Sequence, residues 1–369
     1  MTRSLSLRPA HAAEGARFVE DMGFELPAAY GPAGAELEEQ RLVAAAAGLI
    51  DRSYRGVVDL SGNDVRKVFN KVFSSPVEQL EVGQGQASAL LSHRGRLLGA
   101  FHLFLLENGD LRLVFFEPLR EELVQAIHKY AFLSDIALRD RTAEVAILSV
   151  EGRRAREALE LAAPGCDVPV APLTVRALQL GPADGAAVGC SETPDGGFDV
   201  WIPVAEVADA WARLLAAVRA VGGGPVGHAA AEALRIEAGC ARQGREYDAE
   251  SFPPDAQWEH ALTYDKCYVG QEVVARMKTF GQANQHLAGL ILESQDALAT
   301  PATVRVGEEE AGRATSAARS ARLGKVIALA VLKRRFWGAP NVQVMSPEGE
   351  RSARVMPLPL VRLDGPSPS

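Results

Sequence analysis

One stretch of sequence decides how the rest of this chain is interpreted, Thr263-Tyr-Asp-Lys-Cys-Tyr-Val-Gly-Gln-Glu-Val-Val-Ala-Arg-Met-Lys278. Its first half predicts a tight turn around Gly270. Its second half predicts a short amphipathic helix with an apolar side made by Val273, Val274 and Met277. Gln271 and Glu272 would occupy the first turn, where polar and acidic groups suit the positive end of the helix dipole. Cys267 would lie just before that end, a position that favours a reactive thiolate.

The length and composition of the chain indicate a multidomain globular protein. Its 369 residues exceed an ordinary single core, and 47% hydrophobic with 23% charged residues is normal for a globular chain. No apolar run approaches the roughly 20 residues that cross a membrane, and the N-terminus lacks the apolar centre of a signal peptide. We therefore expect a cytoplasmic protein without a membrane partner, whose first residues form a ragged lead-in.

Charge and cysteine usage exclude two further classes. The formal net charge of −8 argues against binding of long nucleic acid, which depends on neutralising many phosphates. The four cysteines are far apart and have no matching histidine spacing, so neither a metal site nor a disulfide framework is expected: Cys166, Cys190, Cys240 and Cys267. This usage fits a reducing cytoplasm.

The first 150 residues predict an α+β domain. An alanine-rich helix is expected from Gln40 to about Asp51, followed by a strand and turn over Arg55–Gly62. The clearest hairpin signal is the turn Glu107-Asn-Gly-Asp110, which leads into the apolar strand Leu111–Phe116. A further helix and strand are expected at Glu121–Phe132 and Glu144–Val150.

Two further domains are predicted after residue 150. Residues 151–221 predict a second, smaller α+β domain. Gly222-Gly-Gly-Pro225 has the composition of a hinge, and residues 222–284 are expected to complete the first domain. From His286, short alternating strands separated by polar turns predict a small antiparallel β-barrel, which gives a C-terminal domain over residues 285–369.

The opening stretch resembles a known family signature. Cys-Tyr-x-Gly-Gln-Glu followed by Val-Ala-Arg-x-Lys is similar to the Lys-Gly-Cys-Tyr-x-Gly-Gln-Glu signature of the YgfZ family, folate-binding relatives of the glycine-cleavage T-protein. The chain departs at Lys266, where the family has a glycine, and a positive φ there would strain the turn. Weaker matches extend the resemblance over residues 45–360: Arg55-Gly-Val-Val-Asp-Leu-Ser-Gly62, Tyr130-Ala-Phe-Leu-Ser-Asp-Ile-Ala-Leu138, Leu234-Arg-Ile-Glu-Ala-Gly239 and Gly312-Arg-Ala-Thr-Ser316.

The resemblance implies a three-domain ring, two α+β domains and a C-terminal antiparallel β-barrel, with tetrahydrofolate in the central channel. It implies that Glu237 holds the pterin, because the glutamate of Leu-Arg-x-Glu does so in T-proteins. A carboxylate can accept two parallel hydrogen bonds from the pterin amide and amino groups. From the residues alone, Glu237 is equally a surface residue at a helix end. Further candidate folate contacts are Tyr54, as a stacking ring, Tyr268 and Arg276.

One feature of T-proteins is missing from the corresponding stretch here. T-proteins need an aspartate on the hairpin strand, which supports aminomethyl transfer beside the pterin. Gly99 and Ala100 occupy that region, and neither can carry charge or move a proton. His102 is the nearest titratable group, although strand alternation favours a packed histidine.

The resemblance implies a YgfZ-like folate-binding protein that supports iron–sulfur cluster assembly or repair, and through it cluster-dependent tRNA modification. Its implied partners are reduced folate and iron–sulfur client proteins or assembly factors, with Cys267 as the reactive or cluster-interacting residue. Judged without the resemblance, a free cysteine is more often a small buried hydrophobe. Two alternatives stay open: a tetrahydrofolate-dependent aminomethyltransferase of glycine cleavage, and a non-catalytic folate-responsive scaffold.

Overall fold

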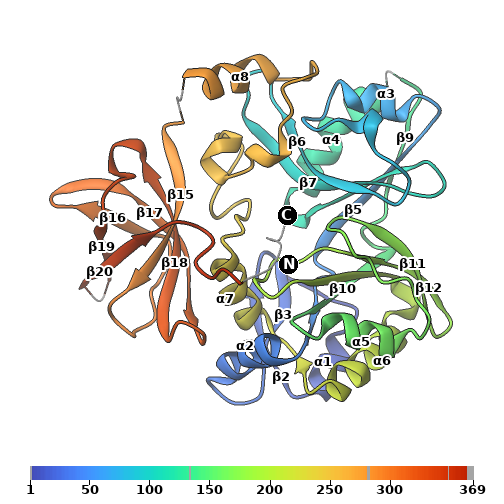
Figure 1. Ribbon diagram of the computed structural model, residues 1–369, viewed down its shortest axis with the longest axis horizontal. Helices are drawn as coiled ribbons and strands as arrows, with labels where there is room; N and C mark the ends of the chain where they lie inside the picture. Colours follow the sequence, from blue (N-terminus) through green and yellow to red (C-terminus); the bar gives the residue numbers. More distant parts are fainter. Residues whose placement is uncertain (1, 133, 281–282, 348, 364–369) are drawn as a thin grey trace.

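The protein consists of three bodies placed around a central region. The computed structural model describes residues 2–132, 134–280, 283–347 and 349–363. Two β-sheets with their helices and a closed barrel surround helix α7 (His228–Ala238), which lies near the middle (Figure 1). The predicted α+β architecture with a C-terminal antiparallel barrel is therefore confirmed.

The first body is a five-stranded antiparallel sheet in the order β6-β7-β8-β5-β9. Helices α3 (Val65–Asn70) and α4 (Arg120–Phe132) contribute Phe69 and Ile127 to the core that covers one face. The predicted hairpin is confirmed, because Leu105 pairs with Leu111. The strands are Gly85–Leu91 (β6), Leu97–Leu105 (β7), Leu111–Phe116 (β8), Arg55–Ser61 (β5) and Ala137–Asp140 (β9).

The second body is a six-stranded sheet in the order β11-β12-β13-β10-β4-β14, with α5 (Ala155–Ala162) and α6 (Val207–Ala220) packed on it. The predicted helix from Gln40 to Asp51 is wrong in its last part. Helix α2 (Ala35–Ala45) ends before it, and Gly48–Asp51 forms the internal strand β4. All four residues of β4 are buried, and periodicity cannot separate such a strand from a buried helix. The other strands are Val175–Leu180 (β11), Ala183–Val188 (β12), Gly197–Pro203 (β13), Val145–Glu151 (β10) and Gly224–Pro225 (β14).

The N-terminal residues form a small three-stranded sheet rather than the expected ragged lead-in. Strand β1 (Arg3–Ser4) pairs in parallel with β3 (Phe24–Tyr30), which also pairs with β2 (Ala16–Asp21). Helix α1 (Arg8–Ala13) lies between β1 and β2 in the chain, and α2 (Ala35–Ala45) follows β3. Leu5, Phe24 and Leu26 are buried together, so the hydrophobic effect holds this segment in place.

The C-terminal body is a closed six-stranded barrel in the order β15-β18-β17-β16-β19-β20. Every neighbouring pair is antiparallel. Alternate residues such as Leu290, Val304 and Ala328 fill the interior, as the alternating pattern predicted. The strands are Gln285–Leu292 (β15), Ala302–Val306 (β16), Glu309–Ser320 (β17), Lys325–Lys333 (β18), Asn341–Ser346 (β19) and Gly349–Met356 (β20).

The segment between the second sheet and the barrel connects all three bodies. Helix α7 packs on β17, β3 and α2, and α8 (Gln271–Phe280) follows the signature turn. The exact domain boundaries remain a proposal, since β4 and β10 share one sheet with residues 175–203. Short 3₁₀ helices lie in the connections at Val77–Gln79, Glu117–Leu119, Val204–Glu206, Pro253–Ala256, Glu259–Ala261 and Arg334–Phe336.

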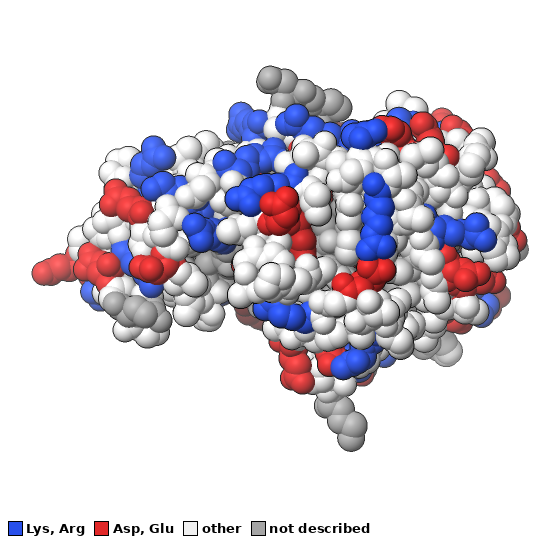
Figure 2. Space-filling model, turned by 90° about the horizontal axis from the view of Figure 1, so that it is seen from below, with Lys and Arg blue, Asp and Glu red and all other residues white. Residues whose placement is uncertain are grey.

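The distribution of surface charge and the hydrophobicity of the helices are relevant to the predictions about nucleic-acid and membrane partners. On the face seen in Figure 2, Lys and Arg side chains gather toward the upper edge, and Asp and Glu side chains lie beside them. This face therefore carries both signs of charge, although the formal net charge of the chain is −8. Across the described residues, no helix is both long and apolar enough to span a lipid bilayer.

Candidate functional site

The signature turn has a backbone that only partly matches the prediction. Gly270 adopts φ +81°, and a Cβ there would lie 2.5 Å from the carbonyl oxygen of Ser92, so glycine is required at this position. Lys266 is not among the described residues with positive φ. The strain expected at Lys266 is therefore absent, because the left-handed conformation falls at Gly270 instead.

The side chain of Lys266 ties the turn to the end of α3. Its ammonium donates hydrogen bonds to the carbonyl oxygens of Asn70 and Phe73, the latter at 2.6 Å. It also lies 4.7 Å from the centroid of the Tyr268 ring. Burial lowers the pKa of Lys266 to about 8. The residue that replaces the family glycine thus anchors the turn.

Cys267 is the exposed member of the four cysteines, all of which lie in the described part of the chain. It lines a pocket of about 710 Å³ together with His93 and Val273. The neighbouring Tyr268 is turned into the core, is 7% exposed and packs near Leu97 and Val274. Its hydroxyl has no hydrogen-bond partner among the described residues. Cys267 is thus open to a partner or reagent, whereas Tyr268 is largely enclosed.

Arg276 lies apart from the other candidate folate contacts. It pairs with Glu272 one turn earlier on α8, and their side chains are 71% and 76% exposed. In Figure 1, α8 lies at the outer end of the molecule, whereas α7 lies near the centre. The fold therefore does not bring Arg276 together with Glu237.

Glu237 is buried between α7 and the barrel. It is 1% exposed, and the Ser320 hydroxyl donates a hydrogen bond to its Oε1. Its Oε2 lies 3.8 Å from Nε of Arg322 but has no hydrogen-bond partner in the described chain. Burial raises the pKa of Glu237, although the Ser320 hydrogen bond and the charge of Arg322 oppose that effect. A buried carboxylate oxygen without a donor fits the donor groups of a pterin.

A large pocket lies beside Glu237 in the chain. The adjacent Ala238 and the C-terminal Val361 line a space of about 1270 Å³, together with Cys190 and Ser191. The amide of Val361 donates to the carbonyl oxygen of Glu237 at 3.1 Å. The size of this pocket suits a ligand larger than a buffer ion.

Tyr54 lies near the opposite end of α7. It is 4% exposed and is buried with Leu5, Phe24 and Leu26. Its ring meets that of His228, the first residue of α7, edge-on with centroids 6.4 Å apart. Its proposed stacking on folate remains a prediction, since its ring is enclosed by protein neighbours.

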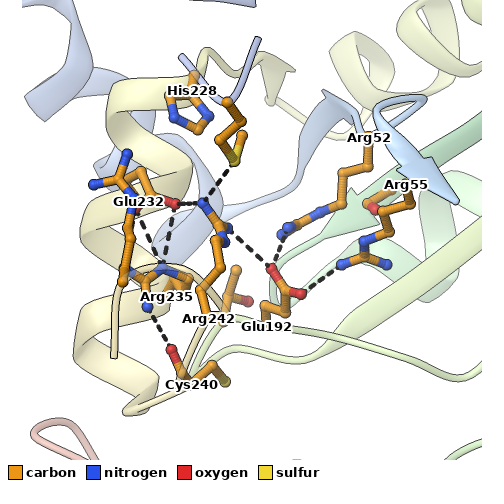
Figure 3. A network of polar contacts seen from close by, with 12 residues as sticks. Arg52, Arg55, Glu192, His228, Glu232, Arg235, Cys240 and Arg242 are labelled. Carbon is orange, nitrogen blue, oxygen red and sulfur yellow. Dashed lines mark hydrogen bonds and ion pairs between the residues drawn. The ribbon is translucent and has the colours of Figure 1, made fainter. Parts of the chain in front are cut away.

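A buried network of charges occupies the central region, and the sequence interpretation missed it (Figure 3). Arg55 Nη2 binds Glu192 Oε1 at 2.7 Å, and Arg55 Nη1 binds Asp199 Oδ2 at 2.6 Å. Arg52 also pairs with Glu192, and Arg242 Nη2 lies 3.8 Å from Glu192 Oε2. Glu192 is therefore the common partner of three arginines.

The network continues onto α7 and into the barrel. Arg242 pairs with Glu232, which also binds Arg235 with Nη2 and Oε2 3.0 Å apart. Arg235 Nη1 binds Glu246 Oε2 at 3.0 Å, and Glu246 in turn accepts a hydrogen bond from the Ser316 hydroxyl of β17. One chain of polar contacts thus connects the three bodies, which orients them around the centre.

The electrostatics of this network set the charge states of its carboxyl groups. Burial opposes ionisation of Glu192, but the charges of Arg52 and Arg55 outweigh it and hold its pKa well below the usual range. Burial raises the pKa of Glu151 to about 7, against the opposing charge of Arg52 and a hydrogen bond from Ser191. The centre therefore combines a firmly ionised Glu192 with Glu151, which titrates near neutral pH.

His102 of β7 lies at the edge of this centre. Its Nδ1 lies 3.6 Å from Sγ of Cys190, and burial, reinforced by the charge of Arg55, lowers its pKa to about 4. Gly99 faces α4, since a Cβ there would lie 2.8 Å from Leu123 Cδ1. Asp199, from β13, is one of the charged groups that act on His102.

The sequence does contain a pattern that could have indicated this buried network, namely charged residues within or directly beside apolar strands. Arg52 and Arg55 flank the turn between two buried strands, and Asp199 lies within the apolar run of β13. A charge at such a position is buried only with a partner. Among the described residues no group of side chains is arranged to hold a metal ion.

Comparisons with known proteins agree with this architecture. The family described as the GCVT N-terminal domain matches residues 7–266, and the glycine cleavage T-protein C-terminal barrel domain matches residues 285–362. Aminomethyltransferases from Alcanivorax borkumensis and Stenotrophomonas maltophilia are each 29% identical to this chain. The alignments cover 98% of this chain and 98% and 97% of those proteins.

The fold also matches a solved structure. The glycine cleavage system aminomethyltransferase T from Bartonella henselae superposes with a TM-score of 0.88 at 20% identity, over 98% of both chains. At that identity the likeness concerns the fold alone. Because the two domain families together cover nearly all of the chain, it belongs to the glycine cleavage T-protein family.

Proposed function

We propose that this chain binds tetrahydrofolate and has a YgfZ-like role, supporting iron–sulfur cluster assembly or repair and cluster-dependent tRNA modification. Aminomethyltransferases of the T-protein family use tetrahydrofolate. The orphaned Oε2 of Glu237 supports folate binding, because a pterin offers the donor that this buried oxygen lacks. Glu237 is followed in the chain by Ala238, which lines the pocket of about 1270 Å³.

The observation that favours a YgfZ-like role over aminomethyl transfer is the lack of a free carboxylate on β7. Gly99 and Ala100 stand where the resemblance implies the T-protein aspartate. Asp199 forms an ion pair with Arg55 through Oδ2 and accepts a hydrogen bond from the Ser149 hydroxyl at Oδ1, so both of its oxygens have partners. With both oxygens engaged, Asp199 offers no free carboxylate oxygen in place of that aspartate.

Cys267 is the proposed reactive or cluster-interacting residue of this role. Its thiol is exposed in a pocket just before α8. Cys190, by contrast, is buried, and burial raises its pKa well above the usual value. The exposed position of Cys267 is compatible with a macromolecular partner.

Aminomethyl transfer is the second candidate, and the relatives favour it. The similar proteins from Alcanivorax borkumensis and Stenotrophomonas maltophilia are named aminomethyltransferases. Asp199 and His102 would be the groups available for proton movement, if substrate binding displaced Arg55 from Asp199.

Two measurements on the purified protein separate these functions. Calorimetry with tetrahydrofolate tests folate binding, which both functions require. A coupled assay with aminomethylated lipoyl carrier protein and tetrahydrofolate then tests the reaction. Binding without turnover supports the YgfZ-like role, whereas turnover of about 1 s⁻¹ or more would establish the aminomethyltransferase.

A cellular measurement tests the iron–sulfur role itself. In a host that lacks its own copy of the gene, we expect wild-type protein to restore the activity of cluster-dependent enzymes and tRNA methylthiolation. The Cys267→Ser variant should fail to restore them, and a Cys166→Ser variant should behave as wild type. Full rescue by Cys267→Ser would leave a folate-responsive scaffold as the better description.

A further inference from the structure

A continuous groove follows the exposed side of α3. A pocket of about 520 Å³ lies between α3 and the end of α4, and it shares Lys71 and Val269 with the pocket of about 710 Å³ beside Cys267. We call the two together the α3 groove. It therefore extends from the end of α4, past the signature turn, to the start of α8.

The floor of the α3 groove is apolar. Val68 and Val72 come from α3 and the residues after it, Tyr130 from α4 and Val269 from the signature turn. An exposed apolar recess is a typical feature of a protein interaction site.

The rim of the α3 groove carries two unpaired cations. Lys67 lies on α3 and Lys71 is the residue that ends it, four positions later with helical backbone angles, so the two side chains lie on the same side. Both are exposed, and neither has an ion-pair or hydrogen-bond partner in the described part of the chain. Of the acidic residues that line the groove, Glu272 is already paired with Arg276, which leaves Asp64 at the far end.

We propose that the α3 groove binds an acidic amphipathic segment of a partner protein. Carboxylates of that segment would pair with Lys67 and Lys71, and an apolar side chain would pack on Val68, Val72 and Val269. Helix-in-groove recognition combines these two features. A partner bound in this way would lie beside Cys267, because the same groove ends at that thiol.

Other occupants fit the α3 groove less well. Nucleic acid requires many cations along a backbone, and here two lysines are free. A lipid surface is flat, whereas these side chains line a recess. A small anion such as phosphate would use the lysines but would leave the apolar floor exposed. Only a segment with both acidic and apolar side chains uses the whole groove.

Fluorescence anisotropy tests the proposal with a defined probe. The probe is a short labelled peptide with Leu and Phe on one helical face and Glu on its flanks, and the control peptide has Lys in place of each Glu. We expect the acidic peptide to bind wild-type protein. The double change Lys67→Glu and Lys71→Glu should lower the affinity for this peptide by roughly tenfold or more. Added salt should weaken binding, because exposed charges are screened.

Matched controls make the outcome decisive. Arg305→Glu with Arg334→Glu changes the charge equally on exposed residues of the barrel and should leave peptide affinity unchanged. Equal affinity for the two double variants or equal binding of the lysine peptide would overturn the proposal. So would displacement of the peptide by inorganic phosphate at an ionic strength at which sodium chloride leaves the peptide bound. So would a wild-type dimer that the Lys67→Glu/Lys71→Glu change converts to monomer, since the occupant would then be a second copy.

The docking proposal and the proposed function can fail separately. Val68→Ser removes part of the apolar floor without changing charge, and it should also weaken the peptide. Neither groove variant should change tetrahydrofolate affinity, because Glu237 lies on α7 and not on the groove. If wild-type protein bound no tetrahydrofolate, the proposed function would fail, whereas the measured peptide binding would still support the docking proposal.

Discussion

Arg55 of β5 and Asp199 of β13 form an ion pair, Nη1 to Oδ2 at 2.6 Å, that joins the five-stranded sheet to the six-stranded sheet. The two side chains are 10% and 4% exposed, so water solvates neither charged group well. Removing one member of such a pair leaves the other buried without compensation. We therefore infer that the main role of this ion pair is structural, to hold the two sheets together.

We expect Arg55→Met to lower the free energy of unfolding by about 3–5 kcal/mol, because Asp199 and Glu192 lose a buried partner. Urea unfolding followed by circular dichroism measures it. The control is Arg276→Met, which breaks the exposed pair with Glu272 and should cost about 0–1 kcal/mol. Similar losses for the two variants would contradict a structural role for Arg55.

Glu151 gives the stability a specific pH dependence. Its pKa is raised from 4.5 to about 7, so the folded protein retains a proton that the unfolded chain releases above pH 4.5. Between these values the folded state binds more protons, and its stability falls as pH rises. We expect wild type to lose stability relative to Glu151→Gln from pH 4.5 to pH 7, measured by urea unfolding. A constant difference between the two proteins, as expected for the exposed control Glu272→Gln, would contradict this.

Glu237→Gln tests the proposed pterin contact with little change in shape. The amide cannot form the charge-assisted pair, so tetrahydrofolate affinity should fall by roughly tenfold or more, on the order of 1.5–3 kcal/mol. Isothermal titration calorimetry provides the measurement. Glu310→Gln on the barrel, which removes an exposed carboxylate, should bind as wild type does. Unchanged affinity for Glu237→Gln removes this residue from the site.

Exposure should set the order in which the cysteines react. We expect iodoacetamide to label Cys267 first in the folded protein. Cys190 should be labelled only after unfolding, because it is buried. Peptide mass spectrometry after timed alkylation resolves the four thiols. Cys267→Ser should remove the fast phase, and Cys166→Ser should preserve it. A Cys267 that resists labelling until denaturant is added would end its proposed reactive role.

Lys266→Gly restores the family residue and removes the tether between the signature turn and α3. Because the ammonium binds the carbonyl oxygens of Asn70 and Phe73, we expect faster hydrogen exchange at the end of α3 in the variant. Lys278→Gly on α8 changes an exposed lysine to the same residue and should leave α3 unaffected. Equal exchange at α3 in wild type and Lys266→Gly would show that the tether contributes nothing.

The amino-acid sequence alone determined the features that depend on near neighbours. The turn at Gly270 with its following helix, the hairpin at 107–110 and the alternation that closes the barrel were all predicted correctly. Each follows from side-chain periodicity and from residues that favour particular backbone angles, and both act over a few positions. The signature stretch is equally local, and the T-protein superfamily that it indicated is the one that the domain matches support.

Only the tertiary structure decided which buried charges meet. Arg55 and Glu192 are 137 positions apart, and Glu237 and Ser320 are 83 apart, so no local pattern indicates either contact. The same holds for Gly48–Asp51, which is a strand because β10 and β14 lie on either side of it. Burial and pairing are properties of the assembled chain, since a charge is stable in the interior only where another segment supplies its partner.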